Sequence, residues 1–359
     1  MRRLLFFLIV VLWPLGLVAQ VDDDGPGLLA RFLQDVLSED ARQVRIRGFQ
    51  GALSTRATVR EITIADEVGD WVTVRNAVID WDRSALLRGR LIIQELAADE
   101  IILMRRPGKG DGTIAPEASG IGLPNLPVSI EIDRVATQRV VLREAFYGTA
   151  ATVSINGSVL LDGGSGEADL QILRTDGNGD GSLLLDADYS ESTGILNLDF
   201  LLTETANGVA ANALRIPDRP SVRLALRGNA PLDDFTARIE LETDGIERLA
   251  GTFNTFASDD VADDEVRRRF GADIAGDVAP IFAPQYRDFF GDDVVLSLAG
   301  TTRLDGSLNI DRMQINAGEI GLGGSLELDP DRIPTRMALQ GRIASRDGSP
   351  VLLPLPGRP

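Results

Sequence analysis

Residues 61–75 read EITIADEVGDWVTVR, in which aliphatic and polar side chains alternate on either side of a short acidic turn. Alternation with a period of two places one kind of side chain on each face of a β-strand. Similar runs begin at Val44, Val78, Ser129, Val222 and Ala237. Dipeptides typical of hairpin turns separate many such runs: Asn156-Gly157, Asp162-Gly163, Asp244-Gly245 and Asp305-Gly306. The sequence therefore predicts an all-β protein.

A six-residue pattern, Gly-Ser-x-x-x-Asp, begins at Gly157, Gly181, Gly306 and Gly324. A turn glycine followed by an alternating strand would form one structural unit, and such units stack into an extended sheet. Ordinary reuse of Gly and Asp in hairpin turns explains the same pattern. We expect residues 41–359 to form an elongated, curved antiparallel β-groove of taco-like section, built from these repeats.

Three segments interrupt the alternation. Residues 84–88 resemble a short, N-capped helical turn, and residues 105–127 are rich in Gly and Pro, as expected of a loop. Residues 261–290 are compatible with a helix, because acidic residues precede Val266 and arginines follow it, with Pro280 and Pro284 dividing the segment. We expect a helical insertion over 261–290 that covers an edge of the sheet.

The N-terminus combines Arg2 and Arg3 with an apolar run over residues 4–19 and three aspartates at 22–24. This order predicts a signal anchor over residues 1–21, with the N-terminus in the cytoplasm and the body across the membrane. A cleaved signal peptide is the alternative, with residues 17–19 as the cleavage site. Residues 22–40 are expected to form a juxtamembrane helix or linker.

The composition excludes several classes of function. The chain has neither cysteine nor histidine, so thiolate nucleophiles, disulfides and Ser-His-Asp arrangements are excluded. The net charge of −18 would be repelled by phosphate backbones, so no nucleic-acid partner is expected. Hydrophobic residues make up 44% of the chain and aromatic residues only 5%, so the apolar content is aliphatic. We expect no enzymatic activity and no cofactor.

The segment Asp176–Gly181 (DGNGDG) matches the first half of an EF-hand calcium loop. The twelfth position of such a loop should be a bidentate Glu but is Ala187, and the flanking segments alternate as strands do. An acidic hairpin turn is therefore the better interpretation, and no metal site is predicted. Paired aspartates at 259–260 and 292–293 lie in turn-like contexts that do not favour a catalytic dyad.

The remaining candidate site is the apolar face of the strands. The side chains expected to line it are Ile62, Ile64, Val72, Val74, Leu224, Leu226, Leu308 and Ile310. An aliphatic sheet face must be covered by protein or by another apolar partner. It could remain open as a groove for acyl chains or for an unfolded strand, or it could be the dry core of a closed sandwich or barrel.

Several motifs resemble the TamB family, the translocation and assembly module subunit. The first is Val44–Ser54 (VRIRGFQGALS), followed by Ile62–Asp66 and Trp71, by Asp80–Leu91 (DWDRSALLRGRL) and by Arg105-Arg106-Pro107. Later segments are similar to the alphaproteobacterial branch: Gly276–Pro280, Tyr286–Gly291 and Gly348–Gly357. The resemblance extends over nearly the whole chain.

The resemblance implies a single-pass inner-membrane protein with its body in the periplasm, related to AsmA and to bridge-like lipid-transfer proteins. It implies phospholipid transport toward the outer membrane through an apolar groove, with acyl chains as ligands. It also implies support of outer-membrane protein insertion with the barrel partner TamA. Family members are several times longer and meet TamA through a C-terminal domain, so TamA as a partner is implied by the resemblance, and direct docking to it is not carried by the motifs quoted above. The alternative is a closed structural or adaptor domain of an AsmA-like envelope protein.

Overall fold

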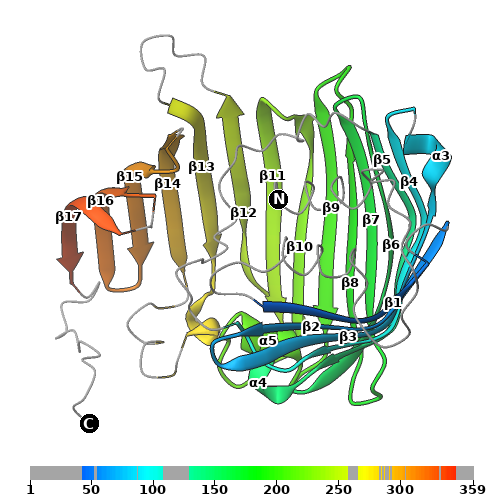
Figure 1. The fold of residues 1–359 in the computed structure, drawn as a ribbon. Coiled ribbons are helices and arrows are strands. Elements are labelled where there is room, and N and C mark those ends of the chain that lie inside the picture. The colour runs from blue at the N-terminus through cyan, green and yellow to red at the C-terminus, as the bar shows by residue number, and fades with distance from the viewer. Residues whose placement is uncertain are drawn as a thin grey trace. The chain divides into compact units, whose positions relative to one another are not determined.

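The computed structural model describes residues 43–51, 55–86, 88–107, 129–257, 266–282, 284, 287, 291, 293–303, 305–330 and 333–344. The predicted signal anchor (1–21) and juxtamembrane segment (22–40) lie outside these ranges. Among the residues that are described, no helix is long and apolar enough to cross a membrane. The predicted all-β class is confirmed, because strands form nearly all of the regular structure (Figure 1).

The chain divides into two compact units, which are described separately. Unit 1 comprises residues 1–114 and 123–184, and unit 2 comprises residues 115–122 and 185–359. The boundary at Leu184 falls within strand β8 (Gly181–Tyr189). Each unit therefore has its own set of paired strands on either side of β8.

Unit 1 is a ladder in which each strand pairs with the next in sequence. Its strands are β1 (Gln43–Gln50), β2 (Arg56–Asp66), β3 (Gly69–Asp82), β4 (Arg90–Leu103), β5 (Ser129–Leu142), β6 (Ala151–Asp162) and β7 (Ser165–Arg174). All neighbours are antiparallel except β4 and β5, which run parallel. The prediction of an antiparallel sheet is wrong at this pair. A parallel pair needs a connection of a dozen residues or more, and residues 104–128 provide one.

A line of irregular residues crosses the first three strands of unit 1. Gly48 and Asn76 have φ values of 64° and 49°, in the left-handed region. The registers of β1–β2 and β2–β3 omit the pairs that would join these residues to Arg60. The left-handed residues at this line shift the side-chain alternation by one residue, so that Val59 and Ile62 contact the same cluster although three positions separate them. The strands bend along their length (Figure 1).

Two short helices, α3 (Arg83–Leu86) and α4 (Glu144–Tyr147), complete unit 1. The helical turn predicted near Ser84 is confirmed, but Asp82 supplies its cap. Asp82 Oδ1 accepts hydrogen bonds from Ser84 N (2.8 Å), Ser84 Oγ (2.7 Å) and Ala85 N (3.3 Å). These hydrogen bonds lower the pKa of Asp82, and the bond from the Ser84 side chain contributes most to the shift. They also fix the conformation of the chain between β3 and β4.

Unit 2 is an antiparallel ladder in which, again, neighbours in sequence are paired. Its strands are β9 (Ile195–Glu204), β10 (Val222–Pro231), β11 (Asp234–Thr243), β12 (Ile246–Ala257), β13 (Val266–Gly276), β14 (Val294–Arg303), β15 (Leu308–Ala317), β16 (Ile320–Leu328) and β17 (Pro334–Ile343). The short helices α5 (Val209–Ala213) and η1 (Ala279–Ile281) lie in two of the connections.

The helical insertion predicted over 261–290 is wrong for its first part, which forms a strand. Val266–Gly276 is strand β13, whereas the 3₁₀ turn η1 follows it, and Pro284 and Arg287 have helical conformation. Phe270, Ala272 and Ile274 alternate with polar or small residues on a strand paired with β12 and β14, and on that face Ala272 is buried and the other two are half-buried. Tertiary pairing outweighs the helix-like order of the charged residues.

The predicted turns are only partly correct. Asp244 and Gly245 form the β11–β12 hairpin with φ values of 52° and 73°, as the dipeptide predicts. Gly157, by contrast, lies inside β6, where a Cβ atom would approach the Asp169 carbonyl oxygen to 2.5 Å. Gly324 lies inside β16. The Gly-Ser-x-x-x-Asp pattern therefore marks turns at some sites and close strand packing at others, and it is not one repeated unit.

Candidate apolar binding face

Strand register shows which side chains share a face, because directly opposed residues point to the same side of a sheet. In unit 1, Ile62 lies opposite Ile46 on β1 and Val74 on β3. Ile64 lies opposite Val44 and Val72 in the same way. The four residues predicted in this part of the chain are thus brought together as two adjacent cross-strand rows.

These rows continue across the whole ladder of unit 1. One runs through Val44, Ile64, Val72, Leu103, Leu142 and Ala151. The next runs through Ile46, Ile62, Val74, Ile101, Val140, Val153 and Arg174. Further along the strands, a row through Trp81, Ile93, Ile132 and Val159 includes the fully buried side chain of Ile93. We call this surface the apolar face of unit 1.

The single charged member of those rows is neutralised locally. Arg174 is only 4% exposed, and its Nε donates to Asp176 Oδ1 at 3.0 Å. Asp176 also accepts from Asn178 N (2.9 Å) and Thr152 N (3.1 Å). Partial burial raises the pKa of Asp176, but the hydrogen bond from Arg174 and those from the two amides together outweigh it, so the pKa of Asp176 is lowered. The first carboxylate of the calcium-like segment therefore braces the β7–β8 turn, and no cluster of three metal-ligating side chains occurs in the described ranges.

Unit 2 has an equivalent face that spans nine strands. Leu226 belongs to a row that runs through Phe200, Leu226, Ile239, Gly251, Ile274, Leu296, Ile315, Leu322 and Gly341. The adjacent row runs through Leu198, Gly228, Ala237, Phe253, Ala272, Leu298, Met313, Gly324 and Leu339. Every member of both rows is uncharged. We call this surface the apolar face of unit 2.

The other predicted residues of unit 2 lie on this same face. Leu224 lies opposite Leu202 and Leu241, one row from Leu226. Leu308 and Ile310 lie opposite Leu328 and Leu326, and across the other edge of β15 they meet Thr302 and Gly300. The eight predicted residues are therefore divided between the two units, four in each, and each set shares one face.

Charged side chains occur only near the strand ends of the apolar face of unit 2, within the described residues. Glu204 ends β9, and its Oε2 accepts from Ala210 N at 2.6 Å at the start of α5. Arg268 lies near the opposite ends of the strands, where its Nε donates to Thr255 Oγ1 at 2.9 Å and its Nη2 donates to the Leu232 carbonyl. Both charged groups are held by named partners, so the face between them offers apolar contact and no fixed charge.

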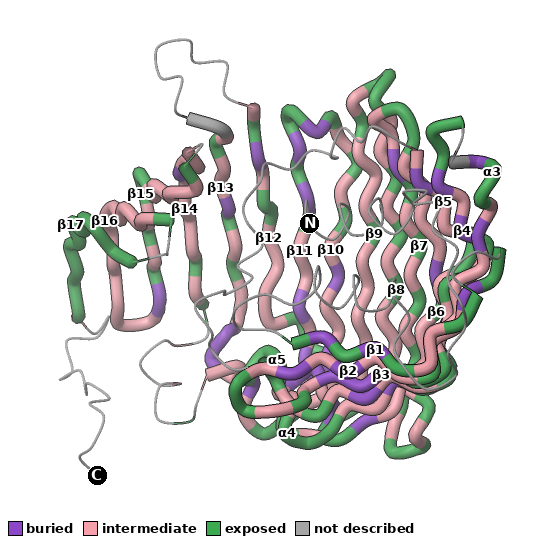
Figure 2. The backbone as a smooth tube through the Cα atoms, in the orientation of Figure 1, coloured by how far each residue is buried: buried purple, intermediate pink, exposed green. Residues whose placement is uncertain are grey.

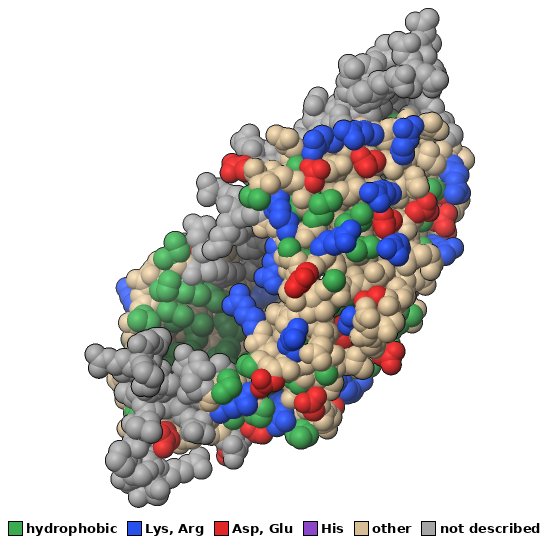
Figure 3. Space-filling view, turned by 90° about the horizontal axis from the view of Figure 1, so that it is seen from below, with side chains coloured by type: hydrophobic (Ala, Val, Ile, Leu, Met, Phe, Trp, Pro, Cys, Tyr) green, Lys and Arg blue, Asp and Glu red, His purple; other side chains and the backbone are tan. Residues whose placement is uncertain are grey.

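The opposite face of unit 1 carries cross-strand rows of acidic and basic side chains that form ion pairs. Arg47 bonds Glu61 at 3.2 Å, and Glu61 lies opposite Arg75. Arg75 and Arg139 both bond Glu100, at 2.6 and 2.8 Å. A second row joins Arg56, Asp80, Glu95 and Arg134. In the space-filling view, basic and acidic side chains are interspersed rather than separated by sign (Figure 3).

These rows are the feature that sequence reasoning missed. Alternation indicates that Arg and Glu share a face, but only the register shows which residues are opposed. The hydrogen bond from Arg139, followed by that from Arg75, lowers the pKa of Glu100. The carboxyl groups with a clear pKa shift are all shifted downward: Asp82, Glu100, Asp176, Glu240 and Asp305. A lowered pKa stabilises the carboxylate form and is the opposite of what a general acid needs.

The arrangement can therefore bind an apolar partner through dispersion and water exclusion. No family model, no curated protein and no solved structure matches this chain. The resemblance to the TamB family accordingly depends on the sequence motifs quoted above.

Proposed function

We propose that this protein is a TamB-like, non-enzymatic envelope component that holds phospholipid acyl chains on its apolar faces and supports lipid transport to the outer membrane. The observation that carries the proposal is the pair of uncharged rows that cross β9–β17 without interruption. Aliphatic side chains dominate these rows, which suits flexible acyl chains better than planar ligands. The role in outer-membrane protein insertion, and TamA as partner, belong to the same proposal.

In this proposal residues 1–21 tether the protein to the inner membrane and the β-body lies in the periplasm. The tether keeps one end of the lipid path at the donor membrane. Lipid moves by exchange between equivalent apolar positions, so no single side chain is essential. A charge introduced on the face should act more strongly than any truncation, because an unpaired buried charge costs several kcal/mol.

The experiment compares charge insertion on the two faces of the same strand. Leu226→Arg places a cation on the apolar face of unit 2, whereas Asn229→Arg places it at an exposed position on the polar face of β10. Leu226 is preferable to Leu224, which packs against a buried cluster and whose replacement would unfold that cluster. The full-length protein is isolated from membranes and probed with a diazirine-bearing phosphatidylethanolamine.

The expected result is strong photocrosslinking for the wild type and for Asn229→Arg, with a loss of at least fivefold for Leu226→Arg. Membrane fractionation should show equal tethering of all three proteins. If the wild type neither crosslinks nor retains phospholipid in native mass spectrometry, lipid binding is excluded. The closed structural or adaptor domain of an AsmA-like protein then becomes the better description.

A further inference from the structure

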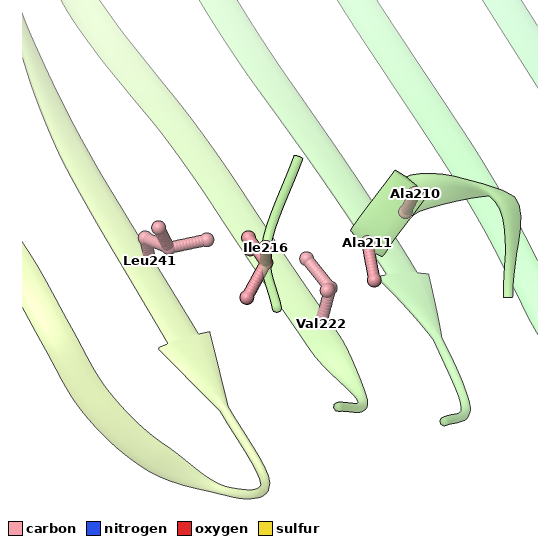
Figure 4. Close-up of a cluster of buried hydrophobic side chains, with 5 residues drawn as sticks. All are labelled: Ala210, Ala211, Ile216, Val222 and Leu241. Atoms are coloured by element: carbon pink, nitrogen blue, oxygen red, sulfur yellow. The ribbon is translucent and has the colours of Figure 1, made fainter. Parts of the chain in front are cut away.

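The β9–β10 connection does not form a tight hairpin. Within residues 205–221, α5 and the segment after it fold back over one end of the apolar face of unit 2. Ala210, Ala211 and Ile216 pack against Val222 on β10 and Leu241 on β11, and all five are buried. Figure 4 shows Ile216 between Leu241 and Val222. Leu202, Leu224, Leu249 and Ile281 pack around this cluster.

The cluster covers one particular row. Leu202, Leu224, Leu241 and Leu249 are successive cross-strand partners on β9–β12. The next row along the strands starts Phe200, Leu226, Ile239, and none of these residues belongs to the cluster. The chain itself thus closes the Glu204 end of the face, and the three residues Ala210, Ala211 and Ile216 are called the end stop.

The end stop is held by its own backbone. Ile216 N donates to the Ala211 carbonyl (2.8 Å) and Arg215 N to the Asn212 carbonyl (3.1 Å), the two bonds of a Schellman motif. Arg215 occupies the left-handed position, with φ of 58°, that glycine usually fills. The motif brings the residue after Arg215 back onto the helix, which is why Ile216 contacts Ala211.

Contacts at both sides fix the connection further. Glu204 caps α5, and a Cβ atom at Gly208 would lie 2.1 Å from the Glu204 Cδ, so a side chain there would displace the capping carboxylate. Asn207 N donates to the Arg219 carbonyl at 2.8 Å. Arg287, beyond η1, donates to Asp218 Oδ2 at 2.8 Å. Asn207, Asp218 and Arg219 also have positive φ, and such strain persists only where contacts over-determine a conformation.

We infer that the end stop limits the depth to which an acyl chain enters the apolar face of unit 2, so that it selects lipids by chain length. This inference rests on the proposed function. From the covered row to the far end of β9–β11, three further rows remain, at Phe200, Leu198 and Leu196 on β9. Rows two residues apart are about 7 Å apart, so the open length is roughly 20 Å. One leaflet of a bilayer core is about 15 Å deep, so a chain with the length that it has in a bilayer fits in front of the end stop, and only longer or more extended chains reach Ile216.

The orientation of the chain is part of this inference. An acyl chain that lies along the strands ends against Ile216, whereas a chain that lies across them follows the uninterrupted rows from β9 to β17 and meets no stop. Only the first orientation makes binding depend on chain length at residue 216. Each methylene that gains or loses burial changes affinity about fourfold, as about 0.8 kcal/mol per methylene implies.

The test uses full-length protein and phosphatidylethanolamines with two identical myristoyl, palmitoyl, stearoyl or arachidoyl chains, mixed in equal amounts in vesicles. Bound lipid is quantified by native mass spectrometry for the wild type, Ile216→Ala, Ile216→Phe and Leu214→Ala. Leu214 is 44% exposed on the same connection and is the matched control. We expect Ile216→Ala to shift the bound lipid toward longer chains and Ile216→Phe toward shorter ones, each by severalfold, with Leu214→Ala unchanged.

Opposite shifts in the two Ile216 variants cannot come from destabilisation, which would lower the binding of all lipids alike. If all four proteins bind lipid with the same chain-length profile, the inference that the end stop selects lipids by chain length is wrong, whereas the proposed function stands. If the wild type binds no lipid, the proposed function fails and the inference fails with it.

Discussion

Strands β2–β5 of unit 1 and strands β15–β17 of unit 2 share the same alternation but differ in how their apolar faces are covered. The first group has 11 to 14 residues per strand and the second has 9 or 10. Ile93 on β4 has no exposed surface, whereas Met337 on β17 is 63% exposed. Figure 2 shows the contrast as buried segments in β2–β5 and an exposed β17. Alternation determines the face of a side chain, and neighbouring elements determine its burial.

The polar faces differ in the same sense. In unit 1, Glu100 is shared between two arginines from different strands and belongs to a row of alternating charges. On β16–β17 the pair Arg336–Glu327 lies on the outermost strand, with both side chains exposed. Networks of charge restrain side chains that isolated surface pairs leave mobile. Unit 1 is therefore expected to be the stiffer region, and the following substitutions test this.

The largest effect is expected from emptying the core of unit 1. Ile93→Ala should lower the free energy of unfolding by about 2–5 kcal/mol, because the side chain is fully buried and leaves a cavity. Met337→Ala, the matched change on β17, should cost less than about 1 kcal/mol. Urea unfolding followed by circular dichroism measures both, and equal losses would contradict the difference in packing between the regions.

The second-largest effect on stability is expected from substitutions at two neighbouring glycines of β16, Gly323 and Gly324. At Gly324, φ is 157° and a Cβ atom would lie 2.0 Å from the Ala338 carbonyl oxygen, so Gly324→Ala should destabilise by about 2 kcal/mol or more. At Gly323 the nearest atom would be at 3.7 Å, so Gly323→Ala should stabilise by about 0.5–1 kcal/mol through loss of unfolded-state entropy. Thermal unfolding of the two variants should give shifts of opposite sign.

A smaller, pH-dependent effect is expected at Glu100. Because Arg139 and Arg75 lower its pKa below the ordinary 4.5, the carboxylate stabilises the fold above that pH and loses this contribution as the pH falls through its folded value. Glu100→Gln should cost up to about 1 kcal/mol at pH 7 and progressively less in acid. Unfolding curves recorded from pH 7 to pH 3 should converge for the two proteins. A constant difference would show that the charge is not responsible.

The smallest effect is expected at the exposed pair on β17. Arg336→Ala should change the free energy of unfolding by less than about 0.5 kcal/mol, because water screens the pair with Glu327. The measurement is the same urea titration, repeated in high salt, where no further change is expected. A loss as large as that of Glu100→Gln would remove the proposed difference between networked and isolated charges.

The sequence supplied the fold class and the faces, because period-two alternation is a local property. Ile62, Val74, Leu226 and Ile310 all lie on the predicted apolar faces, as the registers show. The hairpin at Asp244-Gly245 also follows from local backbone preference. These successes need no knowledge of which strands are neighbours.

The failures all depend on pairing between distant residues. Strand β13 was predicted to be helical because acidic residues precede Val266 and arginines follow it, as at the start of a helix. Its extended conformation depends on pairing with β12 and β14. The charge rows require a register, and the end stop requires a connection to fold back onto strands on either side of it. The Schellman motif at Arg215 could not be predicted from the sequence, because glycine is the residue that usually occupies this position.

The parallel pairing of β4 with β5 has a consequence for folding kinetics. Every other pair in unit 1 joins strands linked by a short connection, so hairpins can form from residues that are close in sequence. The parallel pair aligns residues 39 positions apart at every register position, such as Leu91 with Ile130. Closing so long a loop costs conformational entropy before the stabilising contacts between the two strands can form. The β4–β5 pair should therefore form last and set the folding rate of unit 1.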